Sequence, residues 1–124
     1  MKIQVGIDLC EIERIEKALE KNPLFARRVL GDRERAYYEE HGMKAESIAA
    51  AFSAKEAFAK AMGTGIRDFA MREVEVLHDE LGKPYYAFTG KAAELVEAQG
   101  LTFELSLTHS RSDAAAVAVG YRED

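Results

Sequence analysis

The chain has 124 residues, the usual size of one compact domain, so we expect a single domain over residues 1–124. Hydrophobic residues make up 48% of it, which excludes a disordered chain, and no apolar run approaches the roughly 20 residues that span a bilayer. The formal net charge of −5 argues against a general nucleic-acid-binding protein.

The N-terminus carries no basic segment followed by an apolar run, so we expect no signal peptide. The single cysteine, Cys10, cannot form an internal disulfide, and we interpret it as a small apolar residue near the start of a helix. These features together predict a cytoplasmic protein that binds neither membrane nor nucleic acid.

Apolar residues alternate in some segments and recur at helical spacing in others, and Gly, Pro and Asn separate these segments. In chain order we expect a strand over 2–7, helices over 9–21, 25–30 and 33–40, a long helix over 46–62, strands over 72–78 and 85–88, a helix over 90–98, and strands over 103–107 and 114–121. Asp32 and Thr89 stand where N-caps are expected. The pattern predicts an α+β fold, with a mostly antiparallel sheet, a long central helix and helices packed on one side.

The long helix over 46–62 is apolar or alanine around most of its circumference, which is typical of a buried helix. Ser53, Glu56 and Lys60 form one narrow polar stripe on it. A carboxylate at the edge of a packed surface is costly unless a cation or a hydrogen-bond donor compensates its charge, and two such partners are available to Glu56. Judged on the helix alone, an ion pair between Glu56 and Lys60 is the favoured interpretation, and a bound metal ion is the other.

Asp8 lies where the sequence predicts the passage from a strand to a helix. The ordinary role of Asp in that place is to cap the helix. Asp8 and Glu56 together would also supply the oxygen ligands that Mg²⁺ prefers, with substrate phosphates and water completing its shell. Mn²⁺ accepts the same ligands. Their spacing along the chain does not decide between the two interpretations.

Several segments resemble the holo-acyl-carrier-protein synthases, a family of 4′-phosphopantetheinyl transferases. The longest matches are residues 6–15 (GIDLCEIERI) and 52–65 (FSAKEAFAKAMGTG), and shorter ones are 82–84 (GKP) and 106–110 (SLTHS). They occur in the family's order, and the central motif is long and specific. The resemblance implies transfer of the 4′-phosphopantetheine group of coenzyme A to a serine of apo acyl carrier protein, for fatty acid biosynthesis, with release of 3′,5′-ADP.

Roles for individual residues follow from this resemblance. Asp8 and Glu56 would be the Mg²⁺ ligands, and Lys60 would contact the coenzyme A phosphates and share in catalysis. Glu56 is also a candidate to accept the proton of the serine. The other expected coenzyme contacts are Gly63, Thr64, Gly65 and His109.

The resemblance also implies two kinds of protein partner. The family is typically a homotrimer with active sites between adjacent subunits, so some coenzyme contacts, such as those around His109, would come from a neighbouring subunit. Arg14, Arg27 and Arg28 would meet the acidic carrier protein. By charge pattern alone, this basic cluster is equally consistent with a solvated helical face.

One position departs from the family pattern. An arginine that holds a coenzyme phosphate often precedes the central Phe, and this chain has Ala51 there. Either Lys55 or Lys83 takes its place, or the affinity for coenzyme is weaker.

Two other functions fit the same residues. A Mg²⁺-dependent hydrolase of nucleotide diphosphates would use the same carboxylates and lysine, with water in place of the serine. A non-enzymatic α+β binding module would need only a capping Asp8 and an ion pair on the long helix.

Overall fold

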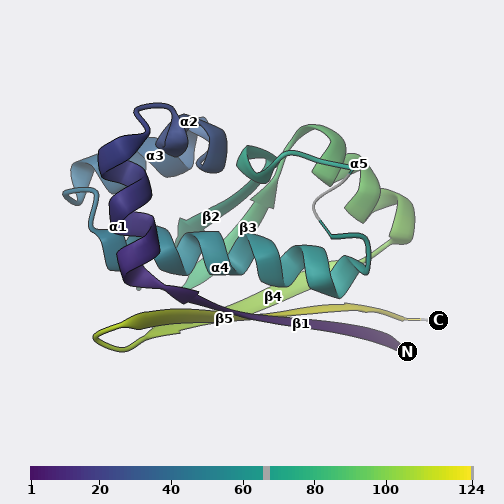
Figure 1. Ribbon diagram of the computed structural model, residues 1–124. Coiled ribbons are helices and arrows are strands. Elements are labelled where there is room, and N and C mark those ends of the chain that lie inside the picture. Colours follow the sequence, from purple (N-terminus) through teal and green to yellow (C-terminus); the bar gives the residue numbers. More distant parts are fainter. Residues whose placement is uncertain (66–67, 124) are drawn as a thin grey trace.

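A long helix, α4, lies across one face of an antiparallel sheet in the computed structural model, which describes residues 1–65 and 68–123 (Figure 1). The elements in chain order are β1 (Lys2–Glu11), α1 (Ile12–Lys21), α2 (Phe25–Val29), α3 (Asp32–Glu40), α4 (Ala45–Met62), the short 3₁₀ helix η1 (Met71–Glu73), β2 (Val74–His78), β3 (Pro84–Phe88), α5 (Gly90–Gln99), β4 (Thr102–His109) and β5 (Asp113–Arg122). Among these residues no helix has the length and apolar character needed to cross a membrane. The predicted α+β fold is confirmed.

The described strands form two antiparallel sheets rather than one. The larger has the order β1–β5–β4, and the smaller is the hairpin β2–β3. β1 pairs with β5 over ten residues, and Asp8 lies opposite Ala116. On the other side of β5, Leu107 of β4 lies opposite the same Ala116. β1 and β4 are therefore separated by a full strand.

The two faces of the larger sheet differ sharply. Alternate residues of β1, such as Gly6 and Cys10, are buried beneath α4. The residues between them point to the opposite face, because successive side chains of a strand alternate. There a row of apolar side chains is 59–70% exposed, and its members are Ile3, Val5, Ile7 and Leu9. A single chain thus leaves an apolar sheet face uncovered.

α4 is predicted almost to the residue, because its composition is strongly helical and Gly63 ends it. Gly63 adopts φ +79° at the C-cap, a conformation that favours glycine. Twelve residues of the helix are buried, most of them alanines. Small side chains let the helix approach the strands closely, and Lys60 of the helix contacts β1.

The start of the chain departs from the prediction. The first strand was expected to end at residue 7, with a helix from residue 9, but β1 continues to Glu11 and α1 begins at Ile12. Asp8 and Cys10 therefore lie within β1, and Glu11 occupies the N-cap of α1. The physical reason is the ladder to β5, which holds this segment extended.

Two predicted helix caps are also corrected. Gly31, rather than Asp32, is the N-cap of α3, and its N–H donates to Glu34 Oε1 at 3.0 Å. Thr89 is the N-cap of α5 as expected, but its side chain makes no capping hydrogen bond. Glu73 Oε2 accepts instead from the backbone N–H of Lys91 at 3.1 Å. The Glu73 carboxylate, from another segment, thus accepts a hydrogen bond that an N-cap side chain would usually accept.

Candidate functional site

Asp8 of β1 and Lys60 of α4 meet where the helix crosses the strand. Lys60 Nζ lies 3.3 Å from Asp8 Oδ1 and donates to the Ile7 carbonyl oxygen at 3.0 Å. The Asp8 side chain is only 15% exposed, whereas that of Lys60 is 56% exposed. The contact joins residues 52 positions apart in sequence. The capping interpretation of Asp8 is wrong, because Asp8 lies inside a strand and faces the helix.

Glu56 lies one turn before Lys60 on the same helix and is half-buried. Burial raises the pKa of Glu56, the negative charge of Asp8 raises it further, and Lys60 lowers it. The Glu56 side chain forms neither an ion pair nor a hydrogen bond within the described part of the chain. The expected Glu56–Lys60 ion pair is therefore not formed, since Lys60 turns to Asp8.

These side chains have the chemistry of a Mg²⁺ site that is completed by a substrate. Glu56 is a partly desolvated carboxylate without a partner, and a second carboxylate is close enough to disfavour its negative charge. A divalent cation would offset both the desolvation of the Glu56 carboxylate and its repulsion by Asp8. The described residues contain no group of three or more His, Cys, Asp or Glu side chains suited to a metal. Two carboxylates suffice for Mg²⁺ where phosphates and water supply its other ligands.

The segment Gly63–Thr64–Gly65 continues from the C-terminal end of α4, just beyond Lys60. Gly63 and Gly65 both have positive φ, at +79° and +66°. Thr64 donates its hydroxyl hydrogen to the Gly65 carbonyl oxygen at 3.0 Å. The segment is thus a largely exposed turn that follows the helix carrying Lys60, and its hydrogen bond lies within the segment rather than with Asp8 or Glu56.

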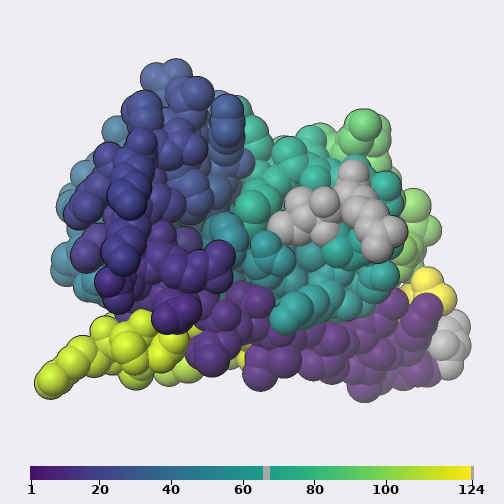
Figure 2. All heavy atoms as spheres, in the orientation of Figure 1, coloured from purple at the N-terminus to yellow at the C-terminus, as the bar shows by residue number. Residues whose placement is uncertain are grey.

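His109 lies apart from Asp8 and Glu56. It is the last residue of β4 and pairs with Ala114, which in turn pairs with Cys10 of β1. Two strand spacings separate His109 from β1, which amounts to about 10 Å between backbones. The space-filling view shows the β4–β5 turn projecting beyond the helices (Figure 2). Within one chain, His109 is therefore not brought together with the other predicted site residues.

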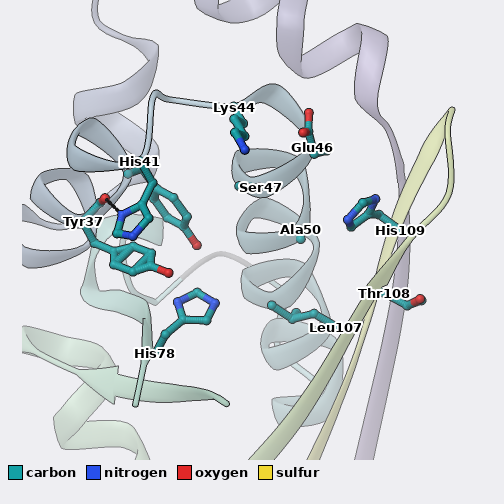
Figure 3. A pocket seen from close by; sticks show the side chains of 11 residues that line it. Tyr37, His41, Lys44, Glu46, Ser47, Ala50, His78, Leu107, Thr108 and His109 are labelled. Atoms are coloured by element: carbon teal, nitrogen blue, oxygen red, sulfur yellow. Dashed lines mark hydrogen bonds between the residues drawn. The ribbon is translucent and has the colours of Figure 1, made fainter. Parts of the chain in front are cut away.

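A pocket of about 280 Å³ lies beside His109, between α3, the start of α4 and the ends of β2 and β4 (Figure 3). Aromatic rings form its far wall: Tyr37 stacks on His41 at 4.2 Å and on His78 at 4.8 Å between ring centroids. Lys44, at the N-cap of α4, also lines it. Sequence reasoning missed this pocket, because its residues come from four separate segments and only those of the 106–110 segment belong to a recognised motif.

The structure excludes Lys55, one of the two proposed replacements for the arginine that is absent at Ala51. Lys55 is fully buried and donates to Glu34 Oε1 at 2.7 Å and to the Val74 carbonyl oxygen at 2.6 Å. A coenzyme phosphate has no access to it, so the prediction for Lys55 is wrong. Lys83 is exposed and pairs with Glu104 at 3.2 Å. Ala51 itself is fully buried.

The arginines of α1, α2 and α3 divide into those with and those without an ion-pair partner. Arg33 is held by Glu75, and Arg35 lies near Asp32 and Glu39. Three other arginines are exposed and form no ion pair with the described residues: Arg14, Arg27 and Arg28. Arg14 lies on α1, whereas Arg27 and Arg28 lie on α2, which begins directly after the exposed Leu24.

Comparison with known proteins identifies related families and structures. The family model of the 4′-phosphopantetheinyl transferase superfamily matches residues 4–118. A holo-[acyl-carrier-protein] synthase of Clostridium botulinum is 40% identical over 115 residues, which are 93% of this chain and 94% of the relative. The crystal structure of the Neisseria meningitidis synthase has a TM-score of 0.88 at 32% identity, covering 96% of this chain and 98% of that one. A Bacillus anthracis synthase in complex with coenzyme A (3′,5′-ADP) has a TM-score of 0.78 at 34% identity, covering 94% of each chain.

Proposed function

The chain belongs to the 4′-phosphopantetheinyl transferase superfamily, and on this premise we propose that it is a holo-[acyl-carrier-protein] synthase acting in fatty acid biosynthesis. It transfers the 4′-phosphopantetheine group of coenzyme A to a serine of apo acyl carrier protein and releases 3′,5′-ADP. The observation that carries this proposal is the meeting of Asp8, Glu56 and Lys60 in a chain so similar to named synthases.

Asp8 and Glu56 would hold Mg²⁺ in this proposal. When bound, the ion neutralises charge on the diphosphate of coenzyme A and on the departing phosphate. Lys60 adds a second positive charge beside the same phosphates, because its exposed ammonium already lies at Asp8. Phosphoryl transfer depends mostly on such positioning and charge stabilisation.

The bond changes in the transfer are simple. The serine oxygen of the carrier forms a bond to the phosphorus that bears the pantetheine arm. The bond from that phosphorus to the oxygen bridging to 3′,5′-ADP breaks, and the bond's electrons stay with the leaving phosphate. The proton of the serine hydroxyl goes to Glu56, directly or through a water molecule, because the Glu56 carboxylate has no other partner within the described residues.

We also propose a homotrimer in which each active site lies between two subunits. The uncovered apolar row on β1 favours burial against another copy of the sheet, because exposed apolar patches of this kind mark interfaces. His109 lies too far across the sheet to serve its own Asp8, so it would meet the coenzyme bound to a neighbour. The segment Gly63–Thr64–Gly65 would contact the nucleotide from the same subunit as Lys60.

Lys44 is our candidate for the cation that replaces the arginine absent at Ala51. It lines the same pocket as His109, and its ammonium forms no ion pair within the described residues. Lys55 is excluded by its burial. Arg14, Arg27 and Arg28 would bind the acidic carrier protein. The cytoplasmic location stays a prediction of the sequence.

Mass spectrometry of an apo carrier protein tests the function directly. Incubated with this protein, coenzyme A and Mg²⁺, the carrier should gain the mass of one phosphopantetheine group, and addition of a chelator should prevent the gain. Release of 3′,5′-ADP should require the carrier. Release without any carrier would indicate a hydrolase, and no gain on several carriers would contradict the transferase.

A further inference from the structure

The buried ammonium of Lys55 stands out among the charged groups that the proposed reaction does not use. Lys55 directly precedes Glu56 on α4, so the two side chains leave the helix about 100° apart. Lys55 points away from β1, toward α3 and β2, and is 0% exposed. Its ammonium donates to Glu34 Oε1 at 2.7 Å, to the Val74 carbonyl oxygen at 2.6 Å and to the Met71 carbonyl oxygen at 3.3 Å.

The acceptor Glu34 is itself held rigidly. Its Oε1 also accepts from the Gly31 N–H at 3.0 Å, and its Oε2 accepts from the Val76 N–H at 2.9 Å. The backbone N–H of Glu34 donates to the buried carboxylate of Glu75 at 3.0 Å. Lys55 therefore ties α4 to α3 and β2 through a partner that cannot shift without breaking several hydrogen bonds.

The Glu56 side chain has no such support of its own, since it makes no hydrogen bond within the described residues. Around it α4 packs inward through the small residues Ala54 and Ala57 and through Phe58, whose ring lies in an aromatic cluster. Such apolar contacts are non-directional, whereas three hydrogen bonds to fixed acceptors fix the rotation of the helix more sharply. The direction in which Glu56 points is thus set mainly by the rotation of α4.

We propose that the buried Lys55–Glu34 pair is a positioning device, which sets the rotation of α4 and thereby aims Glu56 and Lys60 at Asp8. This inference rests on the proposed function, because it assigns a purpose to the same site. Stability alone explains the pair poorly, since apolar residues of similar volume often replace a buried ion pair without loss. Precise orientation of metal ligands, by contrast, depends on the residues behind them.

The test replaces both partners by neutral residues of similar shape, in the double variant Lys55→Met, Glu34→Gln. Calorimetric titration with Mg²⁺ in the presence of coenzyme A should show a dissociation constant raised about 10-fold or more, while circular dichroism shows native helix content. The matched control is Ser53→Ala, which removes a buried hydrogen bond from α4 to the Ala114 carbonyl oxygen and should leave Mg²⁺ affinity near wild type.

A folded double variant that binds Mg²⁺ as tightly as the wild type would overturn the inference. If the double variant does not fold, the single variant Lys55→Met is measured with the same expected and overturning results, because it removes all three hydrogen bonds of the ammonium and leaves those that Glu34 accepts from the Gly31 and Val76 N–H groups. The titration needs no turnover. Wild-type protein that binds Mg²⁺ yet modifies no carrier would refute the proposed function and leave the positioning role standing, whereas wild-type protein without Mg²⁺ affinity would refute both.

Discussion

The backbone of Gly6 in β1 lies directly against that of Ala57 in α4. A β-carbon on Gly6 would collide with the Ala57 carbonyl oxygen and lie 2.7 Å from the Ala61 nitrogen. Backbone atoms cannot move aside as the end of a side chain can. This close approach brings the strand that carries Asp8 to the helix that carries Glu56 and Lys60.

Gly6→Ala should therefore damage both the fold and the site. The extra methyl group must push α4 away from β1, which costs about 1–3 kcal/mol of unfolding free energy. Urea unfolding measures the loss, and Mg²⁺ affinity should fall in the protein that remains folded. Unchanged values of both would show that the strand and helix have more room than this contact implies.

The stability of the protein should fall as the pH falls through the titration range of His78. Burial lowers the pKa of His78, the charge of His41 lowers it further, and Asp79 opposes them. The folded state then binds fewer protons than the unfolded state just below the ordinary histidine pKa, so acid favours unfolding. Urea unfolding between about pH 7.5 and 5.5 measures the slope.

His78→Asn is the informative variant for this pH dependence. It loses the stack on Tyr37, so its stability at a single pH is not informative. The quantity compared with the wild type is the change in unfolding free energy between about pH 7.5 and 5.5, which should be smaller in the variant. A variant with the full wild-type slope would assign the pH dependence to other groups.

Charge reversal of Arg27 and Arg28 should weaken the carrier protein's binding selectively. Both arginines are exposed and unpaired among the described residues, so their replacement disturbs no internal contact. The variant Arg27→Glu, Arg28→Glu should raise the KM for an acidic carrier about 10-fold or more and leave the KM for coenzyme A unchanged. Lys91→Glu, on α5, which η1 separates from α2, is the control. An equal rise of the KM for the carrier in both variants would argue against a specific carrier-binding surface at Arg27 and Arg28.

Mixing inactive subunits tests whether an active site is shared. Asp8→Asn and His109→Ala should each be nearly inactive alone. Refolded together, they should regain activity, because some interfaces then combine an intact Asp8 with an intact His109. A mixture of Asp8→Asn with Glu56→Gln should stay inactive, since both changes damage the same half of the site. No recovery in the first mixture would contradict the assignment of His109 to a neighbour's site.

Local sequence predicts the bounds of α4 well and those of the first strand, β1, poorly. α4 follows from its own alanines and its glycine stop, so its bounds were predicted within one residue. The continuation of β1 to Glu11 depends on β5, which lies about 100 residues later and whose pairing no local pattern reveals. The secondary structure predicted for Asp8 was therefore wrong, while its assignment as a site residue, which rests on the family motif, stays a prediction.

Tertiary partners also explain what was missed at the site. A lysine in a helix is normally solvated, and the burial of Lys55 depends on acceptors from other segments, Glu34 and the Met71 and Val74 carbonyl oxygens. The Glu56–Lys60 pair looked favourable on the helix, but Asp8 of another element competes for the same ammonium. The pocket beside His109 forms only when α3, β2 and β4 come together.

The central claim is that Asp8 and Glu56 jointly hold one divalent cation. Calorimetric titration of Mg²⁺ in the presence of coenzyme A, on Asp8→Asn, Glu56→Gln and the double variant, measures it most directly. Each single variant should raise the dissociation constant about 100-fold or more, and the double variant should be little worse than either, because one remaining carboxylate no longer holds the ion. Wild-type Mg²⁺ affinity in either single variant would contradict a shared site.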